Sequence, residues 1–229
     1  MKKALLAGLL AFISTGVFAQ QKVELKTALD STSYAFGVAM GNSLKETMAT
    51  DLKMDVFMEA MRATLKIEKT AIAPDAALKM QQAYIAKAQA RIAEAWKAKN
   101  LDYLEKNKTR AGVTTTASGL QYEVMRKGTG TTSPTATDKV EVHYHGTLID
   151  GFIFDSSVDR GQTITFGLNQ VIKGWTEGLQ YMKPGDKFKF YIPSNLGYGD
   201  RPAPGGRIKP GSTLIFEVEL FKVNPSCEM

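Results

Sequence analysis

The sequence is short of the residues that carry most covalent and metal chemistry. Its 229 residues include one cysteine, Cys227, and two histidines, His143 and His145. A single cysteine cannot close an internal disulfide, so the core must be stabilised by packing alone. We expect Cys227, third from the C-terminal end, to be a tail thiol without a role; an intermolecular disulfide is the alternative.

Motifs for hydrolysis, metal binding and phosphate binding are also missing. His143 and His145 would share one face of a strand and could form a metal pair. No carboxylate or cysteine at ligand spacing joins them, so we predict no metal and interpret them as an exposed strand face. Ser156 and Ser157 have no partnered base in the sequence. The pair Gly205-Gly206 lacks the Lys-Ser/Thr that follows a phosphate loop.

Neither charge nor hydropathy indicates a nucleic acid or membrane partner. The 29 basic and 23 acidic residues give a formal net charge of +6, with both signs interspersed. This excess is too small to predict nucleic-acid binding. The apolar run at residues 4–13 is too short to cross a bilayer, so we expect no membrane span.

The first 19 residues have the pattern of a signal peptide. Lys2 and Lys3 precede the apolar run, and Val17 and Ala19 stand at −3 and −1 of a cleavage site before Gln20. A buried amphipathic helix is the alternative. No cysteine lies at the cleavage site to accept a lipid. We therefore expect an exported, periplasmic protein without a lipid anchor.

Residues 20–74 are expected to form a small helical domain. Asp30, Ser31 and Ser33 are candidate N-caps of its first helix. That helix contains Gly37 and Gly41, which each cost about 1 kcal/mol of helix propensity. We interpret this spacing as a tight contact between interlocking helices, with ordinary packing inside one chain as the alternative. A second helix is predicted over residues 55–65.

A long helix is predicted over residues 75–111, beginning near Pro74, which suits a first helical position, and ending before Gly112. Much of its surface is polar, which favours a helix that bridges two domains through solvent; folding back along its own domain is the alternative. The three helices carry few large apolar residues for their length. We therefore expect a homodimer through residues 20–74, because a partner would supply the missing burial.

Residues 112–229 have the residue pattern of a β domain. Apolar residues alternate with polar ones around residues 120–124, 140–144, 188–192 and 214–220, and glycine or proline separates these segments. Asp150-Gly151 predicts a hairpin turn, and residues 114–118 a polar loop. One stretch, residues 169–181, fits a short helix instead. The predicted class is α+β, an antiparallel sheet wrapped around a short helix.

Several ordered motifs in this half carry a resemblance to a known family. They read YHGTLIDGFIFDSSVDRG, VIKGWTEGLQYMKPGDKFKFYIP, LGYGD and STLIFEVELFKV. Together, over about residues 120–223, they resemble an FKBP-type peptidyl-prolyl cis/trans isomerase domain. The helical half, with SYAFGVAMGNSLK, is more loosely similar to the N-terminal dimerisation domain of Mip-like and FkpA-like exported isomerases.

The resemblance implies a set of site residues. It assigns catalysis to Tyr144, Phe154, Asp155, Tyr198 and Phe216. It assigns substrate binding to Arg160, Ile164, Phe166, Val171, Ile172, Trp175 and Ile208.

The resemblance also implies roles for some of these residues. Trp175 would be the pocket floor for the proline ring, Tyr198 a hydroxyl donor to the substrate carbonyl, and Asp155 a polar wall held by Arg160 and Tyr144. Ile164 stands where many members have an aromatic residue. The loop at residues 200–209 differs from the usual form, so sequence preference and macrolide inhibitor binding depend on these two places.

The implied activity is prolyl isomerisation of unfolded, proline-containing exported chains, without a cofactor. A dry aromatic cleft would favour the twisted amide, so no nucleophile is required. The alternative is a holdase chaperone in which the helical dimer clamps unfolded chains and the isomerase domain is a binding lobe. Met48, Met54, Met58 and Met61 motivate it, because methionine surfaces adapt to varied partners.

Overall fold

The structure is a computed structural model that describes residues 23–47, 49–201, 203 and 205–225. The expected signal peptide, Met48 and Cys227 lie outside the described residues. The chain divides into two compact units, Met1–Lys53 and Met54–Met229, which are considered separately below. In the part of the chain that the structure describes, no helix combines the length and the apolar character needed to cross a membrane.

The first unit contains α1 (Ala28–Glu46), which begins earlier than expected. Its N-cap is Thr27, whose hydroxyl accepts from the Asp30 N–H at 3.0 Å. The Asp30 carboxylate accepts in return from the Thr27 N–H at 2.8 Å. The expected caps at Asp30, Ser31 and Ser33 are therefore wrong: the three residues lie inside the first turns, and Asp30 completes a capping box.

Helix α1 exposes several large apolar side chains, and none of its residues is buried. Leu29 and Phe36 are 75% and 74% exposed. An added Cβ at Gly37 or Gly41 would meet nothing within 4 Å. Within the described part of the first unit, no neighbour approaches these glycines, and the expected contact between interlocking helices stays a prediction.

The second unit begins with α2 (Met54–Leu65) and α3 (Pro74–Asn107), with Pro74 in the first turn of α3 as expected. The helix ends four residues before the predicted end. Its last turn is fixed by Asn107, whose Nδ2 donates to Gln121 Oε1 at 2.8 Å. The C-terminal part of α3 packs against the sheet domain through buried Asn100 and Leu104. This end of the helix is therefore packed against the sheet domain and not surrounded by solvent. The role of residues 75–111 as a link between domains stays a prediction.

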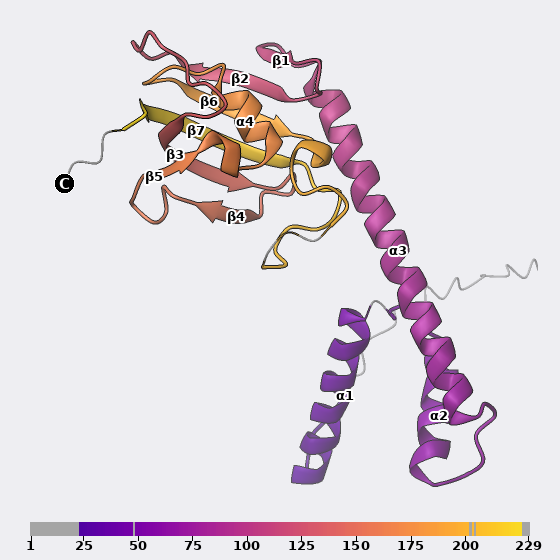
Figure 1. The fold of residues 1–229 in the computed structure, drawn as a ribbon. Helices are drawn as coiled ribbons and strands as arrows, with labels where there is room; N and C mark the ends of the chain where they lie inside the picture. Colours follow the sequence, from indigo (N-terminus) through magenta and orange to yellow (C-terminus); the bar gives the residue numbers. More distant parts are fainter. Residues whose placement is uncertain (1–22, 48, 202, 204, 226–229) are drawn as a thin grey trace, which may run out of the picture. The chain divides into compact units, whose positions relative to one another are not determined.

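Seven antiparallel strands form one sheet in the order β1-β2-β6-β7-β3-β4, with β5 paired to β3 (Figure 1). The short helices between them are η1 (Leu168–Gln170), α4 (Lys173–Leu179) and η2 (Ser194–Leu196). The strands are β1 (Val113–Thr115), β2 (Gln121–Arg126), β3 (Lys139–Thr147), β4 (Ile153–Ser156), β5 (Ile164–Gly167), β6 (Lys187–Ile192) and β7 (Leu214–Val223). The α+β class is confirmed.

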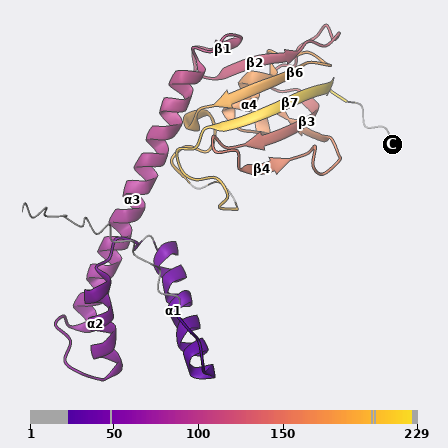
Figure 2. The same cartoon turned by 180° about the vertical axis from the view of Figure 1, so that it is seen from behind.

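Helix α4 lies against one face of the sheet, and the view from behind shows the strands in front of it (Figure 2). Two glycines on α4 permit a close approach to β6. A Cβ on Gly174 would lie 2.4 Å from the Ile192 side chain, and one on Gly178 would lie 2.7 Å from Phe190. Glycine at these positions therefore sets the distance between helix and sheet, which in turn places Trp175 on the inner side of α4.

Two local predictions differ from the structure, and a third is confirmed. The helix predicted over residues 169–181 is shorter, because Val171 is extended and Ile172 is the N-cap of α4. Their apolar side chains pack against the core from the connection. The polar loop predicted at residues 114–118 begins instead as β1, which pairs with β2 at the sheet edge. The turn at Asp150-Gly151 is confirmed, and Gly151 has a positive φ of 84°.

Candidate functional site

A pocket of about 610 Å³ opens beside α4. Strands β3, β4, β5 and β7, the start of α4 and two loops all contribute to its wall. The lining residues are Tyr144, Phe154, Asp155, Ile164, Phe166, Gln170, Val171, Ile172, Trp175, Tyr198, Arg207, Ile208 and Phe216. Most of these side chains are apolar, and a few polar groups converge among them. This is the composition of a small-molecule or peptide site.

Trp175 is the centre of the aromatic wall. Its ring lies 5.0 Å from that of Phe216 and 5.2 Å from those of Tyr144 and Phe166. The contacts to Phe216 and Tyr144 are edge-to-face, the arrangement that aromatic pairs prefer. The Trp175 side chain is 6% exposed, and its buried Nε1 has no hydrogen-bond partner among the described residues. An unpaired buried donor is uncommon and is often found at functional sites.

Gly146 on β3 makes room for two of these rings. A Cβ at this position would lie 2.8 Å from Phe154 and 2.9 Å from Phe216. The two phenylalanines themselves meet edge-to-face with their centroids 5.3 Å apart. A side chain on β3 would therefore displace the rings that form the base of the pocket.

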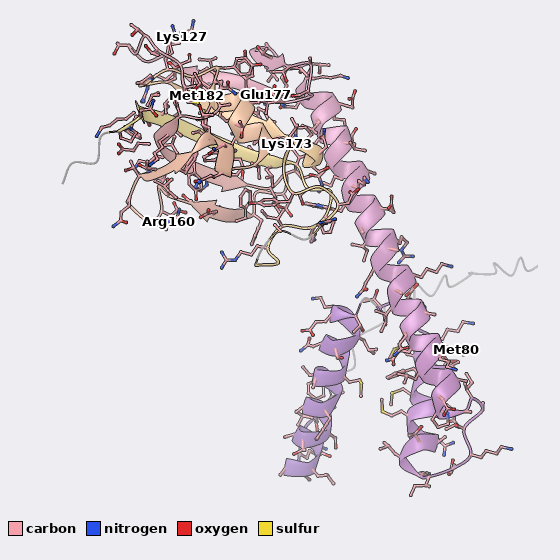
Figure 3. The ribbon with its side chains drawn as sticks, viewed as in Figure 1. Met80, Lys127, Arg160, Lys173, Glu177 and Met182 are labelled. Atoms are coloured by element: carbon pink, nitrogen blue, oxygen red, sulfur yellow. The ribbon has the colours of Figure 1, made fainter. Side chains whose placement is uncertain are left out.

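The polar wall of the pocket is a network of three side chains. Arg160, which comes from the connection between β4 and β5 (Figure 3), forms an ion pair with Asp155. The Tyr144 hydroxyl donates to the other oxygen of Asp155 and accepts from Arg160 Nη2 at 2.9 Å. Asp155 is thereby held in one orientation at the edge of the aromatic wall.

Ionisation of this network follows from its contacts. Burial opposes the charge on Asp155, but hydrogen bonds from Tyr144 and Arg160 outweigh it and hold the pKa of Asp155 below its usual value. Burial and the bond to Asp155 raise the pKa of Tyr144. The carboxylate therefore stays charged, and the phenol stays protonated, at neutral pH.

The Tyr198 hydroxyl is a polar group that is not used in hydrogen bonding within the described residues. The side chain is 39% exposed, and no hydrogen bond to its hydroxyl occurs among the residues described. Burial, with a smaller contribution from the Asp155 charge, raises the pKa of Tyr198. The hydroxyl therefore remains a protonated donor that faces the pocket.

The structure brings the expected site residues together. Eleven of the twelve line the pocket, and Arg160 contacts its wall through Asp155 and Tyr144. Gln170 and Arg207 also line it and were not among the expected residues. Gln170 directly precedes the expected pair Val171 and Ile172. Arg207 lies in the loop whose departure from the family pattern was already visible in the sequence.

The surroundings of the two histidines differ from the exposed strand face that was predicted. His143 and His145 are half-buried, and their Nδ1 atoms each lie 3.0 Å from a serine hydroxyl, Ser157 and Ser156 respectively. The prediction that Ser156 and Ser157 have no partnered base is therefore wrong, because each hydroxyl has a histidine partner. Both serines are buried, and Ser157 Oγ also accepts from the Tyr144 N–H at 2.8 Å. These bonds join β3 to the end of β4 and do not expose a nucleophile.

Two family models match the chain. One describes an FKBP-type peptidyl-prolyl cis-trans isomerase and matches residues 130–221. The other describes a domain amino terminal to FKBP-type peptidyl-prolyl isomerase and matches residues 29–124. The first match spans the strands and helix that form most of the pocket, and the second spans α1 to α3.

Individual relatives match over most of their length. The chain is 41% identical over 206 residues to a probable FKBP-type peptidyl-prolyl cis-trans isomerase FkpA of Neisseria meningitidis, covering 86% of this chain and 75% of the relative. It is 43% identical to the enzyme FkpA of Aeromonas hydrophila, covering 88% and 79%. The crystal structure of FkpA from Escherichia coli matches with a TM-score of 0.69 and 36% identity, over 88% of this chain and 99% of that one. The chain thus belongs to the FKBP-type peptidyl-prolyl cis-trans isomerases.

Proposed function

We propose that the pocket around Trp175 binds the X-Pro segment of an unfolded chain and catalyses its isomerisation by stabilising the twisted amide. The observation that carries the proposal is the aromatic wall. Trp175 lies within 5.2 Å of three other rings, at the base of a pocket large enough for a proline ring and its neighbours. Proline would rest on Trp175, between Tyr144 and Phe216.

The barrier to be lowered comes from amide resonance, which opposes rotation by about 18–20 kcal/mol. The planar amide is more polar than the twisted one, so water favours the ground state. An apolar pocket removes that preference and therefore binds the twisted form better than the planar form. Among the described residues, those that line the pocket include no serine, cysteine, lysine or histidine, which suits a mechanism without a covalent step.

Two polar groups would orient the substrate. The free Tyr198 hydroxyl would donate to a substrate carbonyl, and its raised pKa keeps it protonated. Asp155, fixed by Arg160 and Tyr144, would form the polar wall toward which the amide turns. Phe154, Phe166 and Ile208 would exclude water from the amide.

We infer that the substrates are exported proteins and that the chain acts as a homodimer in the periplasm. The signal-peptide pattern and the resemblance to enzymes named FkpA support export. The apolar, unburied surface of α1 supports a dimer through residues 20–74. In this scheme residues 1–19 are removed, residues 75–111 link the domains, and residues 112–229 carry the isomerase.

Refolding of a protein limited by proline isomerisation tests the proposal. Wild type should accelerate the slow phase at substoichiometric concentration. Trp175→Leu should lose most of this acceleration, because it removes the ring on which proline rests. An unchanged rate with a folded Trp175→Leu variant would show that the pocket is not the site.

A second function is supported by a different surface. Met54 and Met58 on α2 are 55% and 54% exposed, and Val56 on the same helix is 61% exposed. Such a surface would hold unfolded chains as a chaperone while the isomerase acts. Wild type should suppress aggregation of a proline-free unfolded protein, and Met54→Lys/Met58→Lys should not; equal suppression by both would reject this role.

A further inference from the structure

The mouth of the pocket carries a cation without a counter-ion. Arg207 lines the pocket, and its side chain is exposed at the rim. No ion pair or hydrogen bond to its guanidinium occurs among the residues that the structure describes. The neighbouring Ile208 is 6% exposed and belongs to the core. A buried residue therefore anchors the chain directly beside Arg207.

The other charges near the pocket are already occupied. Asp200, the carboxylate of the loop at residues 200–209, pairs with Lys97 of α3 at 3.1 Å. Asp155 is paired with Arg160. The Lys209 ammonium lies 4.9 Å from the centre of the Trp96 ring, on the α3 side of the loop. Neither carboxylate is thus paired with Arg207 in the part of the chain described, and its positive charge at the rim of the pocket is left without a counter-ion.

Helix α3 also holds the end of this loop in place. Trp96 Nε1 donates to Ser212 Oγ at 2.9 Å, and Asn100 Oδ1 accepts from the Thr213 N–H at 2.7 Å. The Gly211 N–H donates to the Gly199 carbonyl at 2.9 Å, which closes the loop at its base. A loop fixed at its base can hold a charge at one place on the rim.

We propose that Arg207 determines substrate preference by selecting X-Pro segments with an aspartate or glutamate close to the proline. This inference rests on the proposed binding of the X-Pro segment in the pocket. Unit charges a few ångströms apart near a protein surface attract appreciably, and salt screens part of that attraction. We expect an acidic peptide to exceed its basic counterpart in kcat/KM by about three- to tenfold at low ionic strength.

The test compares short proline peptides that differ at one position. Glutamate, glutamine or lysine is placed two residues before, one residue before or one residue after the proline, and exchange rates are measured by NMR with the full-length protein. Wild type should favour glutamate over lysine at one or more positions, and 0.5 M NaCl should reduce that ratio. Arg207→Gln should bring the ratio close to one, and Arg207→Glu should invert it.

Arg201→Gln is the matched control, because Arg201 is an exposed arginine of the same loop that does not line the pocket. It should keep the wild-type ratio. Equal rates for glutamate and lysine peptides at every position would overturn the proposal. So would an unchanged ratio in Arg207→Gln, or an equal loss in Arg201→Gln. Failure of the proposed function is distinguishable, because wild type would then not accelerate the uncharged glutamine peptides either.

Discussion

The Arg160 guanidinium donates to the Tyr144 hydroxyl over 2.9 Å, and both side chains also contact Asp155. Tyr144 lies on β3, whereas Arg160 lies beyond the end of β4. The network therefore ties two segments of the pocket wall together through one carboxylate. Its formation depends on Asp155 being charged, which makes the wall sensitive to acid.

The pH dependence of stability should reveal this network. The pKa of Asp155 is lower in the folded protein than its ordinary value near 4, so its contribution is present above about pH 4 and is lost as pH falls through the folded pKa. The difference in unfolding free energy between wild type and Asp155→Asn should thus shrink between pH 6 and pH 2.5. Because the side chain is 44% exposed, we expect a difference below about 1 kcal/mol.

Urea unfolding at several pH values measures this effect. In the Asp155→Asn background, Arg160→Gln should add no further pH dependence, because its partner is already neutral. A difference that stays constant across the whole range would contradict the assigned role of the Asp155 charge.

Gly178→Ala should destabilise the fold. The new Cβ would lie 2.7 Å from Phe190 and would force α4 away from β6, at an expected cost of about 1–3 kcal/mol. Equilibrium denaturation measures the loss. The control is Lys173→Ala, at an exposed position of the same helix, for which we expect a change within about 0.5 kcal/mol. Equal stability of the two variants would show that α4 does not approach the sheet so closely.

Asn100→Ala should loosen the end of α3 and the start of β7. Asn100 is 2% exposed, and its loss would leave the buried Thr213 N–H without an acceptor, at a cost of about 1–3 kcal/mol. Hydrogen exchange of the Thr213 amide should become faster in this variant. Leu101→Ala, at an exposed neighbouring position, should leave that exchange rate unchanged.

Phe36→Asp should convert the proposed homodimer to a monomer. Phe36 is 74% exposed within the chain, and a charge at this position would be buried without a partner in a dimer interface. Sedimentation velocity measures the mass. Leu101→Asp, at a position 58% exposed on α3, serves as a control that should remain dimeric. A monomeric wild type would refute the proposed assembly.

The strands of the sheet were predictable because their signals are local, and most of the pocket was predictable from a family resemblance. Alternating apolar residues such as Val140, Val142 and Tyr144 indicate a half-buried strand whatever the arrangement of the rest of the chain. The shared site of Phe154, Trp175 and Phe216 came from the resemblance of their motifs to the FKBP family. Eleven of the twelve expected residues line one pocket in the structure.

Contacts between distant residues could not be predicted in the same way. The pairing of Trp96 with Ser212 joins residues 116 positions apart, and neither residue is unusual in its own segment. The glycine spacing shows the same limit. Gly37 and Gly41 share their four-residue spacing with Gly174 and Gly178, but only the second pair meets a neighbour within the described chain. Two glycines four residues apart permit another segment to approach the helix closely, but the spacing does not identify that segment.

In the proposed mechanism, Tyr198 and Asp155 act on the substrate in an aromatic pocket without covalent chemistry. A protease-coupled assay with an uncharged proline peptide tests this mechanism most directly. It compares wild type with the full-length double variant Tyr198→Phe/Asp155→Ala, whose folding is verified by circular dichroism. Loss of a hydrogen-bond donor and of the polar wall should lower kcat/KM by at least about tenfold. A folded double variant with the wild-type rate would contradict the account.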